Sequence, residues 1–430
     1  MKKVFRLMLS SLLLFTMVTA LSANGQQESA KPDSGPVVIE WWALSGGGGA
    51  QDPASEFKKQ AVADYEASHP GVKINLTILE NEAFKQKIQV AIQAGDPPDI
   101  FHSWGGGVMV EYARQGMLRD VTDYVNSTLS KKIGLGALGV YGYEGTYYGS
   151  PYDMGGVVFW YNKDIFDEVG VSVPKTWTEL IETSKKIKAA GYVPIAMGAG
   201  DRWPAHFWWV YLAMRIGGID AFNAAYGGNG SFKDETFVKA GELLLDLAET
   251  EPFQTGFLGA SYDDQARLMG DGKAAMELMG QWAPSVEANN SASGEGVANL
   301  GMFTFPAVKG GKGDLKDVMG GGNGYIFGKD APDEALDFLN FYLSVDRQKE
   351  LVDIEGAIPV VKGADAALSG NTAELAKAVS QAGYYQLYYD QFLPPAVGEV
   401  VKDAVAALLA GEATPEEAAA MVDDSWQMEK

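Results

Sequence analysis

The chain has 430 residues, a formal net charge of −22 at pH 7 and no cysteine. The absence of cysteine excludes disulfides and thiolate metal sites, and the acidic balance disfavours binding to nucleic acid or to an anionic membrane surface. A chain of this length can bury a large core without disulfides and is expected to form more than one domain.

The N-terminus has the pattern of a secretory signal peptide. Positive charges precede an apolar run over residues 7–21, and the small residues Ser22 and Ala23 follow it. The run is short for a membrane span, so we predict a signal peptide over residues 1–23, cleavage near Ala23 and a periplasmic product. An N-terminal anchor helix is the alternative. Asn24 stands where a lipoprotein would carry its lipidated cysteine, so no lipid anchor is expected.

Residues 24–35 are polar, which is typical of a flexible leader. Beyond them, strand-like and helix-like segments alternate. The pattern predicts, in chain order, a strand from Val37 to Trp42, a helix from Pro53 to His69, a strand from Val72 to Leu79, and a helix that Asn81 caps and Gly95 ends.

Later segments continue the alternation. Residues 176–179 form a capping box for a helix that runs to Gly191, and Pro332 opens another helix. The end of the chain reads as two or three helices with a break at Gly411 and Pro415. This order predicts an α/β fold with a largely parallel sheet, in which ligands usually bind at the loops that follow the strands.

These loops are rich in tryptophan and glycine. A tryptophan beside glycine or proline in a loop is hard to bury, because loops run on the surface. Indole faces stack on the C–H faces of pyranose rings, while carboxylates and amides bind the sugar hydroxyls. The mixture therefore predicts a sugar pocket. Loop positions favour Trp104, Trp203 and Trp282 as ligand contacts, and we expect one of Trp41 and Trp42 in the core. Four more are expected in the core: Trp160, Trp177, Trp208 and Trp209.

Two glycine runs, 46–49 and 320–322, are candidate sites of close backbone approach to a ligand. Neither is a phosphate-binding loop, because the Lys-Ser/Thr pair and the following helix are missing. A flexible loop between strands is the alternative for each run.

Three groups of motifs span much of the chain. They are Gln93–Ile100 with Gly116–Asp120; Tyr147–Asp153 with Phe159–Asp164 and Pro174–Trp177; and Gly272–Met276 with Gly280–Trp282. In order and spacing these stretches resemble the family 1 extracellular solute-binding proteins of bacterial ABC importers, the group that contains maltose-binding protein. The glycine-rich first loop lacks the charged pair of maltose-binding protein, so the resemblance does not imply maltodextrin as the ligand.

The resemblance implies a two-lobed periplasmic-binding-protein fold of type II, with a ligand cleft between the lobes. Lobe one would hold residues 36–149 plus 301–345, and lobe two residues 150–300 plus 346–430. Closure of the hinge over a bound mono- or oligosaccharide, followed by docking on the membrane permease, is the implied mechanism.

The residues and the resemblance together predict the contacts to the ligand. The expected substrate-binding residues are Trp42, Ser45, Gly46, Glu82, Ser103, Trp104, Asp153, Asp201, Trp203, Trp282, Gly322 and Asn323. We expect no catalytic residues, no metal ligands and no cofactor. The expected partners are a carbohydrate and the permease subunits, with no nucleic acid, and the protein is expected to be a monomer. The tyrosine-rich stretch 384–389 could cap the cleft.

Two other functions fit parts of the pattern. A carbohydrate-active enzyme would need two carboxylates across the scissile bond, which Glu82, Asp153, Asp201 or Glu277 could supply, but no hydrolase motif surrounds them. A binding protein for a polyamine or an iron complex is the second alternative, because an acidic pocket suits a cationic solute.

Overall fold

The computed structural model describes residues 35–47 and 51–430. The predicted signal peptide and the leader up to residue 34 lie outside the described residues. Within the described part of the chain, no helix is both long enough and apolar enough to cross a membrane.

One sheet is built from strands distant in sequence. Its strands are β1 (Val37–Leu44), β2 (Val72–Leu79), β3 (Ile100–Ser103), β6 (Gly149–Pro151) and β13 (Gly324–Phe327). The order among the described strands is β2-β1-β3-β13-β6. β1 runs parallel to β2 and β3, whereas β13 is antiparallel to β3 and β6. The chain therefore leaves this sheet after β6 and returns to it with β13.

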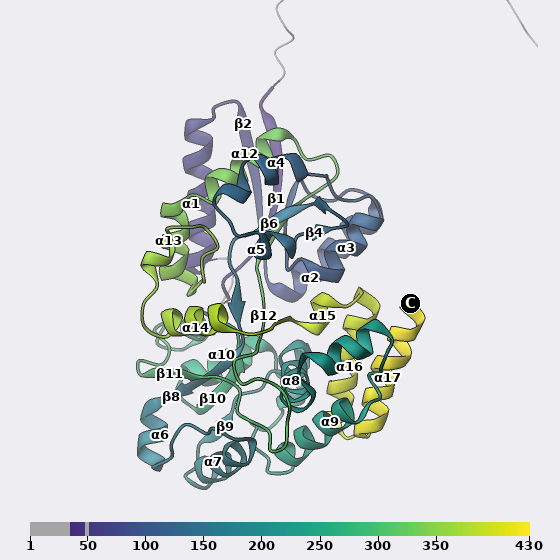
Figure 1. Cartoon of the computed structure of the whole chain (residues 1–430). Helices are drawn as coiled ribbons and strands as arrows, with labels where there is room; N and C mark the ends of the chain where they lie inside the picture. Colours follow the sequence, from purple (N-terminus) through teal and green to yellow (C-terminus); the bar gives the residue numbers. More distant parts are fainter. Residues whose placement is uncertain (1–34, 48–50) are drawn as a thin grey trace, which may run out of the picture. The chain divides into compact units, whose positions relative to one another are not determined.

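Helices pack around this first sheet, with α1 against β2 and α12 against β1 (Figure 1). The helices and the small hairpin of this region are α1 (Pro53–Ser68), α2 (Asn81–Ala94), α3 (Gly106–Arg114), α4 (Thr122–Ser127), α5 (Leu135–Gly139), α12 (Asp333–Tyr342), α13 (Val345–Glu355), β4 (Gly142–Tyr143) and β5 (Thr146–Tyr147). Gly95, in the left-handed conformation with φ 73°, ends α2 as predicted.

The predicted cap of α2 is wrong by one residue. Glu80, not Asn81, is the N-cap, and its carboxylate accepts hydrogen bonds from the backbone N–H groups of Glu82 and Ala83 at 3.0 and 3.2 Å. A carboxylate at this position also interacts favourably with the helix dipole. Asn81 therefore becomes the first residue of the helix.

A second sheet has the order β11-β8-β10-β9 among the described strands. Its strands are β8 (Val158–Asn162), β9 (Val193–Ile195), β10 (Ala274–Met279) and β11 (Leu300–Phe303), and its helices are α6 (Lys163–Val169), α7 (Trp177–Ala189), α8 (Trp203–Gly227), α9 (Glu235–Ala248), α10 (Tyr262–Gly270) and α11 (Ala283–Asn290). The capping box of Thr176 and Glu179 at the start of α7 is confirmed. Only β10 and β9 pair in parallel, so the expectation of a largely parallel sheet fails here.

Three short strands stand where the chain passes between the two sheets. β7 (Gly155–Gly156) follows β6 and precedes β8, and β12 (Val318–Gly321) comes before β13; β14 (Tyr385–Leu387) pairs with β12. Because β11 pairs with β8, residues 300–303 belong to the second sheet. The lobe boundaries at 149 and 300 stay a prediction, and the strand pairing favours crossings near β7 and β12.

The C-terminal helices are α14 (Gly370–Gln381), α15 (Tyr389–Phe392), α16 (Pro395–Ala410) and α17 (Pro415–Glu429). α16 and α17 pack on each other and on α9 (Figure 1). The predicted break between them is confirmed, since Gly411 has φ 74° and Pro415 starts the next helix.

Separate apolar cores stabilise the two sheets. Trp41, which is 1% exposed, packs edge-on against Tyr325, Phe338 and Tyr342 in the first core. The second core contains the four tryptophans predicted to be buried, and that prediction is confirmed: Trp160, Trp177, Trp208 and Trp209. Leu351 also packs in the first core, which favours a lobe-one boundary beyond residue 345.

Candidate functional site

A cavity of about 1060 Å³, including the solvent at its mouth, is lined by residues from the part of the chain around the first sheet and from the part around the second sheet. Seven of the predicted site residues lie on its wall: Ser45, Gly46, Trp104, Asp153, Trp203, Trp282 and Asn323. Their roles in ligand binding remain predictions.

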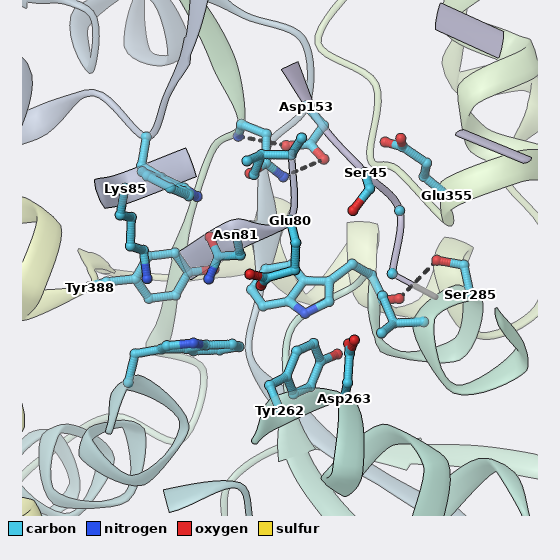
Figure 2. A pocket seen from close by; sticks show the side chains of 18 of the residues that line it. Ser45, Glu80, Asn81, Lys85, Asp153, Tyr262, Asp263, Ser285, Glu355 and Tyr388 are labelled. Carbon is cyan, nitrogen blue, oxygen red and sulfur yellow. Dashed lines mark hydrogen bonds between the residues drawn. The ribbon is translucent and has the colours of Figure 1, made fainter. Parts of the chain in front are cut away.

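The start of α2 contributes polar groups to the cavity. Asn81 and Lys85, four residues apart, lie on the same helix face, and both line the wall with the capping residue Glu80 (Figure 2). The predicted contact Glu82 is absent from the wall. Its carboxylate instead pairs with Lys85 at 2.7 Å and accepts from the Asn81 side chain at 3.0 Å.

The Lys85 ammonium lies close to two indole rings. Its Nζ is 5.6 Å from the ring centroid of Trp104 and 5.9 Å from that of Trp203. Both distances are within the range of a cation–π contact. A lysine side chain therefore lies next to Trp104, in the loop after β3, and Trp203, the first residue of α8.

Asp153 is a buried carboxylate at the junction of three segments. Its Oδ1 accepts from the backbone N–H of Asn323 at 2.7 Å, and its Oδ2 accepts from the side chains of Asn323 and Gln281 at 3.0 and 3.2 Å. Burial raises the pKa of Asp153 to about 7, and the charge of Glu355 also raises it, while the three hydrogen bonds lower it. The carboxyl group is therefore balanced between its two protonation states near neutral pH.

A second buried charge at the wall is neutralised by its partner. Lys58, in the middle of α1, is 2% exposed, and its Nζ donates to the Glu355 carboxylate at 2.9 Å. Both residues line the cavity.

Aromatic rings form the side of the cavity that the second core supports. Trp203 lies 4.9 Å from Tyr262 and 6.3 Å from Trp282, measured between ring centroids, and Phe207 stacks on Tyr388 at 5.1 Å. Figure 2 shows Tyr262 and Asp263 together on one side of the cavity. We call these five rings the aromatic wall. Such a wall offers a large apolar contact area with few rotatable bonds.

Local structure explains how these rings reach the cavity. Asp201 accepts a hydrogen bond from the backbone N–H of Tyr262 at 2.7 Å, which joins the segment before Trp203 to the start of α10. Ser261 and Asp264 form a capping box at that helix start. Trp282 is the N-cap residue of α11.

The loop after β1 packs closely on α11. The carbonyl of Gly46 accepts from the Asn289 side chain at 2.9 Å, and a Cβ on Gly47 would lie 2.8 Å from the Val286 side chain. Gly47 also has φ 85°, which favours glycine. Gly47 therefore permits close approach to α11, whereas a Cβ on Gly46 would meet Asp52 and Ala54.

Besides Glu82, four predicted site residues lie off the cavity wall, each with another partner. Lys87 Nζ lies 4.2 Å from the ring centroid of Trp42. The Ser103 hydroxyl accepts from the backbone N–H of Gly105 at 3.0 Å, and Asp201 holds α10 as described. A Cβ on Gly322 would overlap the Met154 side chain, so glycine is required there by internal packing.

Sequence reasoning missed many of the polar and aromatic residues of the wall. They are Lys58, Glu80, Asn81, Lys85, Tyr152, Phe207, Tyr262, Asp263, Ser285, Glu355, Asp390 and Gln391. The capping box before Tyr262 was a usable signal, since it places a helix start beside a loop. Lys58 had none, because it stands inside an ordinary helix. Tyr388, from the stretch considered as a cap, does line the cavity. In the described part of the chain, no three His, Asp or Glu side chains form a group suited to a metal ion.

The model of the bacterial extracellular solute-binding protein family matches residues 48–349. An uncharacterised ABC transporter extracellular-binding protein of Pyrococcus horikoshii is 26% identical over 386 residues, which cover 84% of this chain and 81% of that protein.

Two solved structures are similar over nearly their whole lengths. One, from work on xylan utilization by the thermophilic bacterium Caldanaerobius polysaccharolyticus, has a TM-score of 0.83 and 28% identity, and the match covers 90% of this chain and 99% of that one. The other, a chitin oligosaccharide binding protein, has a TM-score of 0.82 and 26% identity, and the match covers 91% of this chain and 98% of that one. The predicted α/β, two-lobed periplasmic-binding-protein fold of type II is confirmed.

Proposed function

The chain belongs to the bacterial extracellular solute-binding proteins, and we propose that it captures a mono- or oligosaccharide in the cavity and delivers it to the permease of an ABC importer. In this proposal the protein is exported by its N-terminal signal peptide and acts as a periplasmic monomer. Hinge closure over the sugar supplies the form that the permease accepts, because a ligand that contacts both lobes favours the state in which both contacts are made.

The aromatic wall facing a row of hydrogen-bonding groups is the observation that carries this proposal. Trp203, Trp282 and Tyr262 offer ring faces, and Glu80 and Asn81 offer oxygen and nitrogen atoms across the same cavity (Figure 2). A pyranose needs both kinds of surface, since its C–H faces are apolar and its rim carries hydroxyls. The similar chitin oligosaccharide binding protein supports the same class of ligand.

Calorimetry against a panel of mono- and oligosaccharides tests the proposal. The panel should include xylo-oligosaccharides and chito-oligosaccharides, because the two similar structures come from work on xylan and on chitin oligosaccharides. We expect at least one sugar to bind and to raise the midpoint of thermal unfolding, since a ligand of the native state stabilises it. A panel in which no sugar binds would reject saccharide capture.

Binding without turnover is part of the proposal. The family consists of binding proteins, and we expect no product when the bound sugar is incubated with the protein and analysed by chromatography. Release of a shorter sugar would establish the carbohydrate-active enzyme instead.

A polyamine is the second candidate ligand, because the charges of the cavity favour a cation. Lys58 and Lys85 are the positive groups of the lining, whereas five carboxylates line it: Glu80, Asp153, Asp263, Glu355 and Asp390. Spermidine and putrescine therefore belong in the same calorimetric panel. Tight binding of either amine in the absence of sugar binding would replace the saccharide by a polyamine.

A further inference from the structure

A buried ion pair lies at the wall of the cavity. Lys58 Nζ donates to Glu355 Oε1 at 2.9 Å, and the two side chains are 2% and 15% exposed. Both residues line the cavity, so the pair is shielded from bulk water and still borders the space that a ligand would fill. Removing two charges from water has a cost that their mutual attraction often does not exceed. Stability alone therefore does not explain a charged pair at this place.

Each partner keeps hydrogen-bonding capacity that the described residues do not use. An ammonium group has three N–H donors, and Lys58 Nζ uses one on Glu355 and one on the Ala54 carbonyl, at 3.3 Å. Glu355 Oε1 accepts from Lys58, while Glu355 Oε2 has no hydrogen-bond partner among the described residues. The pair therefore offers one donor and one acceptor next to each other.

A neighbouring carboxylate on the wall is already occupied. The oxygens of Asp153 accept three hydrogen bonds, from the backbone N–H and the side chain of Asn323 and from the side chain of Gln281. Figure 2 shows Asp153 and Glu355 on the same side of the cavity. On this side, the pair therefore holds the charged hydrogen-bonding groups that remain for a ligand.

The positions of the two charged groups are fixed by helices from distant parts of the chain. Lys58 lies inside α1, Glu355 is the last residue of α13, and the two helices contact each other. Gly356, with φ 64°, ends α13, and a Cβ on it would lie 3.1 Å from the Gln281 carbonyl. The donor and the acceptor are therefore presented to the cavity at a fixed spacing.

We propose that Lys58 and Glu355 together bind a vicinal diol of the ligand, and so select sugars with two adjacent free hydroxyls at the position that faces the pair. Lys58 donates to the oxygen of one hydroxyl, and the neighbouring hydroxyl donates to Glu355. The identity of the ligand as a sugar rests on the proposed function, while the capacity of the pair to bind a diol does not.

The chemistry of a vicinal diol matches the pair. A hydroxyl both donates and accepts, so two adjacent hydroxyls can meet one donor and one acceptor at the same time. Hydrogen bonds to ionised groups are also stronger than those between neutral groups. A sugar that lacks one of the two hydroxyls would leave a charged group without its partner in a site shielded from water, and such a site discriminates strongly against it.

Calorimetry with xylotriose and N,N′-diacetylchitobiose tests the contact. Lys58→Met and Glu355→Gln each remove one charge, and the double variant removes both without leaving an unpaired charge in the wall. Lys402→Met is the matched control, since Lys402 is 6% exposed and pairs with Glu399 at 2.7 Å but lies off the cavity wall. We expect the first three variants to bind about 10–100-fold more weakly and the control to bind like the wild type. An unchanged affinity in the double variant, or an equal loss in the control, would overturn the contact.

Two further readouts separate a diol contact from a purely structural role. The wild type should prefer xylotriose about tenfold over mono-deoxy derivatives that lack a hydroxyl of the diol, and the double variant should lose this preference. With spermidine the single variants should have opposite effects, because Lys58→Met removes a repulsion and Glu355→Gln an attraction. Opposite effects with a sugar as well, or a deoxy preference that persists in the double variant, would overturn the inference.

Crystals soaked in glycerol test the pair without an assumption about the natural ligand. Glycerol carries a vicinal diol, and trimethylene glycol, whose two hydroxyls are separated by a further carbon, is the control. We expect glycerol to bridge Lys58 Nζ and Glu355 Oε2 in the wild type but not in the double variant, and trimethylene glycol to bridge them in neither. No glycerol at the pair in the wild type would overturn the inference. Glycerol at the pair in a protein that binds no sugar would reject the proposed function and keep the diol site.

Discussion

The two sides of the cavity differ in chemistry. The side built on the first sheet presents charged and amide groups, including Lys58, Glu80 and Asn81, whereas the side built on the second core presents the aromatic wall. Polar groups with fixed hydrogen bonds discriminate between ligands by the position of hydroxyls, while rings supply apolar contact area. We therefore expect the polar side to contribute mainly to selectivity and the aromatic wall mainly to affinity.

The largest effect should come from Trp203, a large ring that belongs to both the aromatic wall and the second core. Trp203 is 8% exposed and packs against Phe207, Tyr262 and Trp282. Trp203→Ala should lower the free energy of unfolding by about 3–5 kcal/mol, because it leaves a cavity in the second core. Urea denaturation measures this loss. A stability equal to that of the wild type would show that the aromatic wall is not continuous with the core.

The next largest effect should fall on affinity. Trp282 is half-buried and lines the cavity, so Trp282→Ala should weaken sugar binding by roughly 1–3 kcal/mol in calorimetry. Trp42→Ala is the matched control, since Trp42 is also a half-buried tryptophan but lies off the cavity wall. Equal losses in the two variants would remove the distinction between rings on the wall and rings outside it.

On the polar side, Asp153 should matter more for stability than any other single carboxylate. Asp153→Asn places an amide donor against the donors of Asn323 and Gln281, which should cost roughly 1–3 kcal/mol in the free energy of unfolding. The pKa of Asp153 is raised to about 7, so its contribution to stability falls as the pH rises from 3.8 to about 7.

The asparagine variant should lack that part of the pH dependence. Denaturation curves at several pH values within this interval measure it. A pH profile of Asp153→Asn that matches the wild type would place the titration elsewhere.

The smallest effect should come from Lys85, which contacts rings of both sides. Lys85→Met keeps the aliphatic chain and removes the charge, so the ligand-free protein should lose about 0.5–1 kcal/mol of stability. It should also bind spermidine more tightly, since one positive charge leaves the cavity. Lys87→Met is the control. Lys87 is on the same helix as Lys85 and also lies over a tryptophan ring, that of Trp42, but it is outside the cavity. Tighter spermidine binding in the Lys87 variant alone would contradict the placement of the Lys85 charge in the cavity.

The pattern of apolar residues and turns predicted most of the helices and strands. It was least accurate where a single side chain determines where a helix begins. The helix after β2 was expected, but Glu80 caps it in place of Asn81. Periodicity does not distinguish two adjacent polar residues that can both cap a helix.

The candidate site was predictable where rings stand at loop ends, as at Trp104 and Trp282, and unpredictable where long-range pairing places a residue. Lys58 and Glu355 are distant in sequence, and neither has a local signal for a place in a cavity. Gly322 was expected to contact a ligand, but the glycine run packs internally: Gly320 lies against the Gly155 carbonyl, Gly321 against Tyr388 and Gly322 against Met154. Sequence shows that a position needs glycine, while only the fold shows what approaches it.

The position of β13 has a consequence for how the protein is made. In the described sheet, β6 pairs only with β13, and β13 also supplies one of the two neighbours of β3. Neither pairing can form until synthesis has passed residue 327, which is long after residue 151 has emerged. Because non-local pairing of this kind is slow, we expect the first lobe to complete its folding late, only after the segment that returns to it has been synthesised.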